Sequence, residues 1–295
     1  MILIDPAVWP AHGTVFSHLV SDTSLAELHE FARAAEIPER AFDHDHYDVP
    51  LSRYDDLVAR GAVPVSAKEL LQRLVASGLR MRTTERTPKR VVALQRLAES
   101  WQELLPGHDA IGAELVERWT ESHRHYHDVR HLLQVLTALV QVGPPTTPDD
   151  DRTLRLAAWF HDAVYEGTEH DEENSAQLAE RMLGRFLPTR QVDEVARLVR
   201  LTRTHDPDEH DQAGAQLVDA DLSVLGQRPG RYDVYVRDVR ADYAHVPDEL
   251  WRFGRLRVLD HLLGLTPLFR TARGRELWAE RATENLTAER ARWAG

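Results

Sequence analysis

The 295-residue chain contains no cysteine. Disulfides, thiolate zinc sites and cysteine nucleophiles are therefore excluded, and the candidate metal ligands are His, Asp and Glu side chains. Lysine is nearly absent too, with Lys68 and Lys89 as the only examples, so arginine carries almost all of the positive charge. Arginine is suited to bidentate contacts with phosphate. Without soft sulfur ligands, a bound metal would be a hard or borderline divalent ion.

Long apolar runs and a basic leader are also missing. The chain opens with MILIDPAVWP, and no uninterrupted apolar stretch is long enough to cross a bilayer. These features predict a cytoplasmic protein with no membrane partner. The formal net charge of −12 disfavours nucleic acid as a partner, except for short single strands, because general affinity comes from cations placed on phosphates. A homo-oligomer is compatible with the sequence.

The length and the patterning predict a multidomain protein. Residues 1–82 alternate strand-like runs with helical patterns, which indicates a small α/β domain. Residues 83–90 are polar, contain a proline and predict a linker. Residues 91–295 are helical almost throughout, which predicts an all-α domain. The helices predicted there span residues 91–105, 109–121, 125–142, 151–165, 171–186, 189–204, 213–226, 231–244, 248–264 and 274–292.

Chelating residues fall on the apolar stripes of four predicted helices: His131, His161 with Asp162 immediately beside it, His205 at the end of its helix, and Asp221. A buried, unpaired carboxylate costs several kcal/mol, so buried charges are normally paired or bound to metal. A single inward His or Asp is most often a hydrogen-bonded core residue. Four that converge from separate helices favour a metal site instead.

The order of these residues resembles the H…HD…D signature of the HD superfamily of predicted metal-dependent phosphohydrolases. The resemblance covers about residues 91–292, and it extends to the surrounding segments Tyr126–His131, Ala157–Tyr165, Leu201–His205 and Asp219–Gly226. It implies an HD-type helical fold and an enzyme that hydrolyses a phosphate ester, such as a nucleotide or another small phosphorylated metabolite. It also implies a divalent ion (Mn, Co, Mg, Fe, Ni or Zn) held by His131, His161, Asp162 and Asp221.

Further roles follow from the needs of that reaction. Glu172 is the first candidate for general acid or base and His205 the second. The alternatives are a solvated carboxylate in the first turn of a helix for Glu172, and a helix-terminal cation or a ligand of a second metal for His205. Arg124 and His127 are predicted to bind substrate, His127 from one turn before His131 on the same helical face. Asp171 stands where relatives tend to have Asn.

Two other functions compete with the hydrolase. The helical domain could sense a nucleotide or alarmone, with the N-terminal domain as the effector. A nuclease of short single-stranded ends is less favoured because the chain is acidic and lacks an arginine–aromatic stripe.

Residues 1–82 resemble a bacterial domain of unknown function. The resemblance rests on segments such as Trp9–Gly13, Ser17–Leu19 and Asp45–Pro50. Clusters of His and Asp can form a second metal or phosphate site. The alternative is that they serve as turn and cap residues around a small sheet. The residues concerned are Asp5, His12, His18, Asp22, His29, His46 and Asp48.

Overall fold

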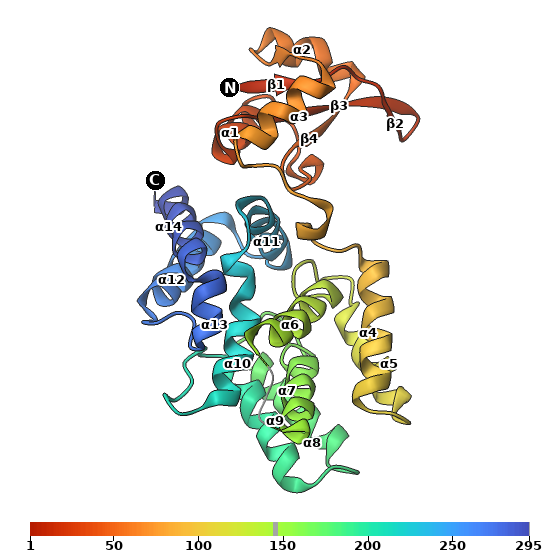
Figure 1. Ribbon diagram of the computed structural model, residues 1–295, viewed down its shortest axis with the longest axis vertical. Helices are drawn as coiled ribbons and strands as arrows, with labels where there is room; N and C mark the ends of the chain where they lie inside the picture. Colours follow the sequence, from red (N-terminus) through yellow and green to blue (C-terminus); the bar gives the residue numbers. More distant parts are fainter. Residues whose placement is uncertain (144–146, 295) are drawn as a thin grey trace. The chain divides into compact units, whose positions relative to one another are not determined.

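The computed structural model describes residues 1–143 and 147–294, which fold as two compact units. The first unit comprises Met1–Arg86 with Arg228–Arg237, and the second comprises Thr87–Gln227 with Asp238–Gly295. A small α/β region followed by an all-helical region was predicted, and this fold class is confirmed (Figure 1). One segment departs from the predicted division, because Arg228–Arg237 groups with the first unit and not with the rest of residues 91–295.

The first unit contains a mixed sheet centred on β3. This strand pairs antiparallel with β1, β2 and β4, whereas β1 pairs parallel with β5. The strands are β1 (Ile2–Ile4), β2 (Trp9–Ala11), β3 (Thr14–Ser21), β4 (Tyr47–Pro50) and β5 (Val63–Pro64). The helices are α1 (Leu25–Ala34), α2 (Tyr54–Ala59) and α3 (Ala67–Ala76), with short 3-10 turns at Glu39–Ala41, Leu51–Arg53 and Thr83–Glu85.

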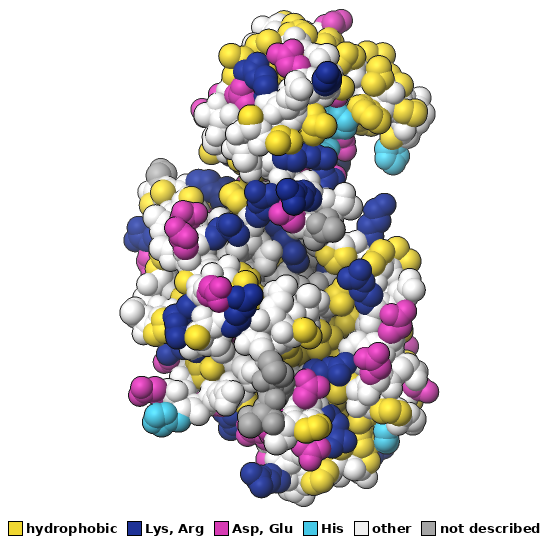
Figure 2. Space-filling view, in the orientation of Figure 1, with side chains coloured by type: hydrophobic (Ala, Val, Ile, Leu, Met, Phe, Trp, Pro, Cys, Tyr) yellow, Lys and Arg dark blue, Asp and Glu magenta, His cyan; other side chains and the backbone are white. Residues whose placement is uncertain are grey.

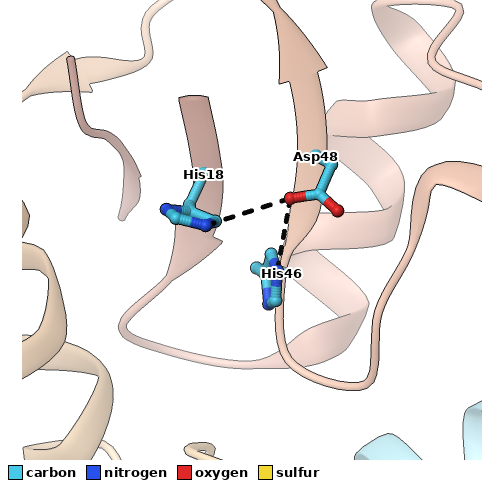
Figure 3. Close-up of side chains that lie close together, drawn as sticks. All are labelled: His18, His46 and Asp48. Carbon is cyan, nitrogen blue, oxygen red and sulfur yellow. Dashed lines mark ion pairs between the residues drawn. The ribbon is translucent and has the colours of Figure 1, made fainter. Parts of the chain in front are cut away.

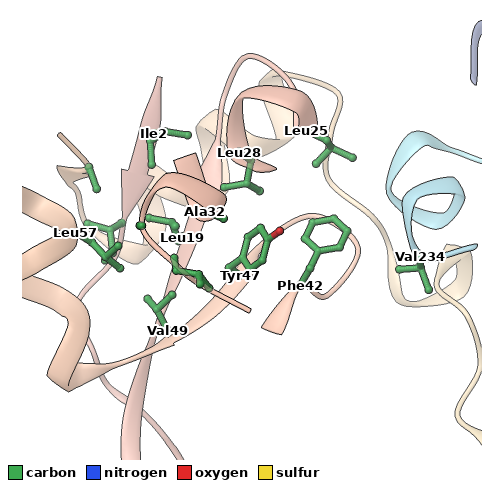
Figure 4. Packing of buried hydrophobic residues seen from close by; sticks show 14 residues of the cluster. Ile2, Leu19, Leu25, Leu28, Ala32, Phe42, Tyr47, Val49, Leu57 and Val234 are labelled. Atoms are coloured by element: carbon green, nitrogen blue, oxygen red, sulfur yellow. The ribbon is translucent and has the colours of Figure 1, made fainter. Parts of the chain in front are cut away.

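Apolar residues cover both faces of this sheet because successive side chains of a strand point to opposite sides. Ile2, Ile4 and Leu19 pack on one face with residues of α1, in the cluster that Figure 4 shows. Leu3 and Val20 pack on the other face with residues of α3. The sheet is therefore covered by apolar contacts with α1 on one face and α3 on the other.

The second unit is helical throughout its described residues. The predicted helices recur with ends shifted by a few residues. They are α4 (Arg90–Leu104), α5 (Asp109–Trp119), α6 (Val129–Val142), α7 (Pro148–Phe160), α8 (Asp171–Leu183), α9 (Thr189–Leu201), α10 (Gln212–Asp221), α12 (Asp248–Gly264), α13 (Ala272–Gly274) and α14 (Glu280–Ala294). Helix α11 (Pro229–Asp242) is divided, because its residues up to Arg237 group with the first unit. A 3-10 segment, Leu222–Gly226, follows α10, and a π-helical turn, Arg275–Ala279, precedes α14.

Helices α6 and α7 form the centre of this unit. Helix α6 packs against α4, α7 and α10, and α7 also packs against α9. Trp119 and Trp159 are fully buried there, and the Trp119 indole donates a hydrogen bond to the Trp159 carbonyl at 3.0 Å. This core fixes the ends of the helices that carry the candidate site.

The outer surface contrasts with this core. Acidic, basic and apolar side chains are interspersed over the visible face of the helical unit (Figure 2). Within the two described ranges, no helix combines the length and hydropathy needed to cross a bilayer.

Candidate metal centre

His131 lies in the first turn of α6. The helix begins at Val129 because the Asp128 carboxylate caps it, accepting a hydrogen bond from the Arg130 backbone N–H at 2.7 Å. Asp128 is in turn held by the Arg90 guanidinium at 2.7 Å. The His131 side chain is almost fully buried, and its Nδ1 has no hydrogen-bond partner among the described residues. The polar contacts of this imidazole are therefore made through Nε2.

His161 and Asp162 follow the last residue of α7. The His161 imidazole is buried, and its Nδ1 lies 2.8 Å from the Ala158 carbonyl oxygen. This contact makes Nδ1 the donor nitrogen, which leaves the Nε2 lone pair directed into the site. The sequence had predicted a longer helix, over 151–165, but α7 ends at Phe160, so Asp162 projects from the turn that follows.

The four candidate ligands, His131, His161, Asp162 and Asp221, converge on one point within the helical core. The Nε2 atoms of His131 and His161 are 3.1 Å apart, and Asp221 Oδ1 lies 3.1 Å from His131 Nε2 and 3.6 Å from His161 Nε2. Asp162 Oδ2 lies 3.2 Å from His161 Nε2 and 3.7 Å from His131 Nε2. Two donors bound about 2.1 Å from one ion stand about 3.0 Å apart at a right angle and about 3.4 Å apart at a tetrahedral angle. These side chains therefore have the chemistry and spacing of a metal shell.

The pKa values of the four side chains also favour a bound cation. Burial opposes protonation of His161, but the charges of Asp162 and Asp221 raise its pKa to about 9. Burial also opposes ionisation of the two carboxylates, yet the neighbouring imidazoles hold the pKa values of Asp162 and Asp221 below their ordinary range. Burial lowers the pKa of His131. The pocket thus stabilises buried positive charge, which a divalent cation would supply.

Asp221, the last residue of α10, also contacts His205. His205 Nε2 lies 2.9 Å from Asp221 Oδ2, so the two oxygens of this carboxylate face different imidazoles. His205 has a φ of 52°, a left-handed conformation that is uncommon for a residue other than glycine. The structure thus places His205 beside the cluster, in contact with a candidate ligand.

Glu172 and Glu173 lie in the first turn of α8, and their environments are opposite. Burial raises the pKa of Glu172, and the charges of Asp162 and Asp171 act in the same direction. Hydrogen bonds from Arg200 lower the pKa of Glu173 to about 2. Glu172 therefore has the environment of a proton donor near the cluster, whereas Glu173 is an ion-pair residue.

Asp171 has a local structural role. Its Oδ2 accepts hydrogen bonds from the backbone N–H groups of Glu166, Gly167 and Thr168 at 2.9, 2.8 and 3.1 Å. This carboxylate holds the loop between α7 and α8.

Arg124 was predicted to contact a substrate phosphate. The structure places its side chain in a different position. Its side chain is fully buried, and the guanidinium donates to the carbonyl oxygens of Asp162 at 2.7 Å, His127 at 3.1 Å and Ala163 at 3.2 Å. It also lies over the rings of Trp119 and Tyr165. Because its donors are engaged inside the core, Arg124 fixes the backbone around Asp162 and does not reach a phosphate in this conformation.

His127 lies in the segment before α6 and not within a helix, as had been predicted, because Asp128 starts the helix. Its Nδ1 lies 2.7 Å from Asp242 Oδ2, and its ring stacks on Tyr165. Asp242, which also accepts from the Tyr126 and His127 backbone N–H groups, was missed by the sequence analysis. It lies 115 residues away in the chain, so nothing in the local sequence indicates the contact.

The His and Asp residues of the first unit divide into several groups. His18, His46 and Asp48 form a second group whose ligand atoms lie within 4.8 Å of one another. His29 instead contacts Tyr47 at 2.8 Å and Asp233 at 3.3 Å, and Asp22 contacts Arg73. His12 is exposed in the turn between β2 and β3.

Comparison with known proteins gives a family for the first unit alone. Residues 2–77 match the sequence model of a family described as a protein of unknown function (DUF4031). No curated protein and no solved structure matches the chain. The match lies within the α/β unit and carries no activity.

Proposed function

We propose that the helical unit is an HD-type phosphohydrolase that uses a divalent metal held by His131, His161, Asp162 and Asp221. The observation that carries this proposal is the convergence of two imidazole Nε2 atoms and carboxylate oxygens, 3.1 to 3.7 Å apart, in a buried pocket. The order of these residues along the chain, which resembles the HD signature, supports the same reaction class. When bound, the ion would neutralise charge on a phosphate oxygen and lower the pKa of a coordinated water.

The surrounding residues position the ligands. The Ala158 carbonyl fixes the tautomer of His161, and Arg124 holds the backbone carbonyls of Asp162 and Ala163. His205 occupies one oxygen of Asp221 and leaves the other directed at His131. The cluster is therefore ordered by contacts outside it, as a binding site for a small hard or borderline ion requires.

Two groups beside the cluster can handle protons. Glu172, whose pKa is raised by burial, is the group that would deliver a proton to the leaving oxygen. His127 is oriented through Nδ1 by Asp242, which leaves Nε2 for a substrate oxygen or water. Glu172 is the general acid in this proposal, and His127 a substrate-binding residue.

The test is hydrolysis of a panel of nucleoside mono-, di- and triphosphates and short oligonucleotides with added manganese, cobalt or magnesium. Wild type is compared with Asp162→Ala and with Asp211→Ala, which removes a carboxylate that caps α10 and contacts Arg197. The proposal expects metal-dependent turnover in wild type and Asp211→Ala, and none in Asp162→Ala.

Two outcomes would contradict it. Metal-independent turnover, or turnover that survives Asp162→Ala in a folded protein, would place the reaction elsewhere. Tight binding of nucleotide without turnover by any metal would favour a nucleotide-sensing or alarmone-binding unit with the first unit as effector.

A further inference from the structure

The α/β unit contains its own convergence of His and Asp side chains on one face of the sheet. His18 of β3 and Asp48 of β4 are cross-strand partners in the antiparallel register, so their side chains lie on the same side. His46 immediately precedes β4, in the segment that leads into the strand. Figure 3 shows the three side chains directed toward one another, those of His18 and Asp48 from the paired strands and that of His46 from the segment before β4.

The imidazoles approach Asp48 through Nε2. His46 Nε2 lies 3.4 Å and His18 Nε2 lies 3.9 Å from Asp48 Oδ1. Both distances exceed the usual range of about 2.7–3.2 Å for an N–H···O hydrogen bond. The three side chains are thus aimed at a common point without being joined by good hydrogen bonds there.

Each imidazole is oriented by a different buried carboxylate at its other nitrogen. His18 Nδ1 lies 2.9 Å from Asp5 Oδ2, and His46 Nδ1 lies 2.7 Å from Asp45 Oδ1. Both carboxylates are at most 1% exposed. A carboxylate that accepts from Nδ1–H fixes the tautomer with a lone pair on Nε2, which is the arrangement that supports histidine ligands of metals.

The two orienting carboxylates are themselves held. Asp5 Oδ1 accepts from the His18 backbone N–H at 2.6 Å. Asp45 Oδ2 accepts from the Met81 backbone N–H at 2.7 Å and from the Arg80 guanidinium at 2.9 Å. The orientation of both imidazoles is therefore built into the fold of the unit.

The point at which the donors meet is open to solvent. The Asp48 side chain is 47% exposed and that of His18 is 28% exposed, while Trp9, half exposed, lies beside His18 with ring centroids 5.3 Å apart. Histidine side chains are visible on the surface of this unit in Figure 2. The exposed Asp48 side chain has room to rotate toward an ion, and the three ligand atoms already lie within 4.8 Å of one another.

From this geometry we infer that His18, His46 and Asp48 bind a divalent ion of the Zn²⁺ type, with Asp5 and Asp45 as positioning residues. Two imidazoles and one carboxylate are ligands suited to such a borderline ion. Three protein donors leave a coordination position for water or an anionic ligand, as in zinc sites that bind substrate. This inference is independent of the function proposed for the helical unit.

The test is a calorimetric titration of the metal-free full-length chain with Zn²⁺. His18→Ala and Asp48→Asn should each remove one of the zinc equivalents that wild type binds, or the single equivalent if the helical unit binds none. His12→Asn, which removes an exposed histidine of the same unit, should leave the isotherm unchanged. Asp48 is half exposed, so Asp48→Asn preserves the fold, which circular dichroism checks.

The inference is overturned if the isotherms of His18→Ala and Asp48→Asn superimpose on that of wild type, or if His12→Asn alone loses zinc. Nitrogen NMR of the histidine rings gives a second readout on the unmodified protein. Added Zn²⁺ should shift the Nε2 resonances of His18 and His46 and leave their Nδ1 atoms protonated. Unchanged Nε2 resonances at saturating zinc would also overturn it.

Discussion

The helical centre and the sheet cluster combine histidine and aspartate in different surroundings. In the helical unit, His131 and His161 are almost fully buried, whereas in the α/β unit Asp48 is nearly half exposed. The ligands of the buried cluster come from segments up to 90 residues apart. Despite burial, neighbouring carboxylates raise the pKa of its His161 to about 9, and the same holds for His46 in the sheet cluster. The sheet cluster obtains its ligands from β3, β4 and the residue before β4, and buried carboxylates orient its imidazoles.

The two units prepare their sites for a metal ion in different ways. Burial makes positive charge a requirement in the helical unit, because two carboxylates there would otherwise be uncompensated. In the sheet cluster the orientation of the imidazoles is the main preparation, since solvent screens the exposed carboxylate. Substitution of a residue that positions the ligands should therefore mainly lower the stability of the helical unit. In the α/β unit it should mainly weaken metal binding.

The largest expected effect is on stability, from arginines that support the two clusters. Arg124→Met removes a fully buried guanidinium that donates to three carbonyl oxygens, and we expect it to lower the free energy of unfolding by about 3–5 kcal/mol. Arg80→Met should cost about 1 kcal/mol, because Arg80 is 37% exposed and Asp45 keeps its contact with the Met81 N–H. Urea unfolding of both variants measures the difference. Equal losses in the free energy of unfolding would contradict the expectation that support residues matter more for stability in the helical unit.

The next effect is on catalysis by the proposed general acid. Glu172→Gln should reduce kcat by about 10²-fold or more, since it removes the proton that Glu172 would deliver. The pKa of Glu172 is raised, so the acid form is lost as pH rises through that value, and the wild-type rate should fall there. The variant should lack this alkaline limb in a pH–rate profile. A retained limb would assign the proton to another group.

A smaller effect is expected on the metal affinity of the sheet cluster. Asp5→Asn should weaken zinc binding at His18 by about 10–100-fold, because an amide N–H group facing Nδ1 would favour the tautomer that carries its proton on Nε2. The stability of the unit should change little, as the asparagine oxygen can still accept from the His18 backbone N–H. Calorimetry with zinc checks this outcome. An unchanged affinity would mean that Asp5 does not orient the ligand.

The smallest effect is expected from Glu173, the neighbour of Glu172. Glu173 lies 2.6 Å from Arg200 Nε, and its pKa is lowered to about 2 from an ordinary value of 4.5. Its stabilising contribution is therefore complete above pH 4.5 and disappears as pH falls through about 2. Because both side chains are more than one-third exposed, Glu173→Gln should cost at most about 1 kcal/mol at pH 7 and less than that at pH 2. Thermal unfolding at the two pH values measures it, and hydrolysis should be unaffected.

Much of the helical unit could be predicted from sequence because its helices are long and amphipathic. The inward phases of His131 and Asp221 follow from apolar residues three and four positions away. The strands β2, β3 and β4 were not predicted individually. β2 and β4 are short and contain proline, and the pairing of both with β3 is a long-range property. A local sequence pattern indicates which face of a segment is buried, but not which other segment packs against that face.

The supporting contacts show the same limit. Helix α6 begins at Val129, four residues later than predicted, which leaves His127 outside the helix, although the aspartate at position 128 is a capping signal visible in the sequence. The burial of Arg124 and the contact between His127 and Asp242 depend on how the helices pack together. The same holds for His18 and Asp48, which meet through strand register.

The most direct test of the account is anomalous diffraction from crystals of the full-length protein soaked in Mn²⁺ or Zn²⁺. We predict a peak within about 2.3 Å of His131 Nε2, His161 Nε2 and the nearest oxygens of Asp162 and Asp221. A well-ordered cluster that keeps its contacts of 3.1 to 3.7 Å, with no peak at saturating metal, would contradict the proposed metal centre and with it the proposed hydrolase.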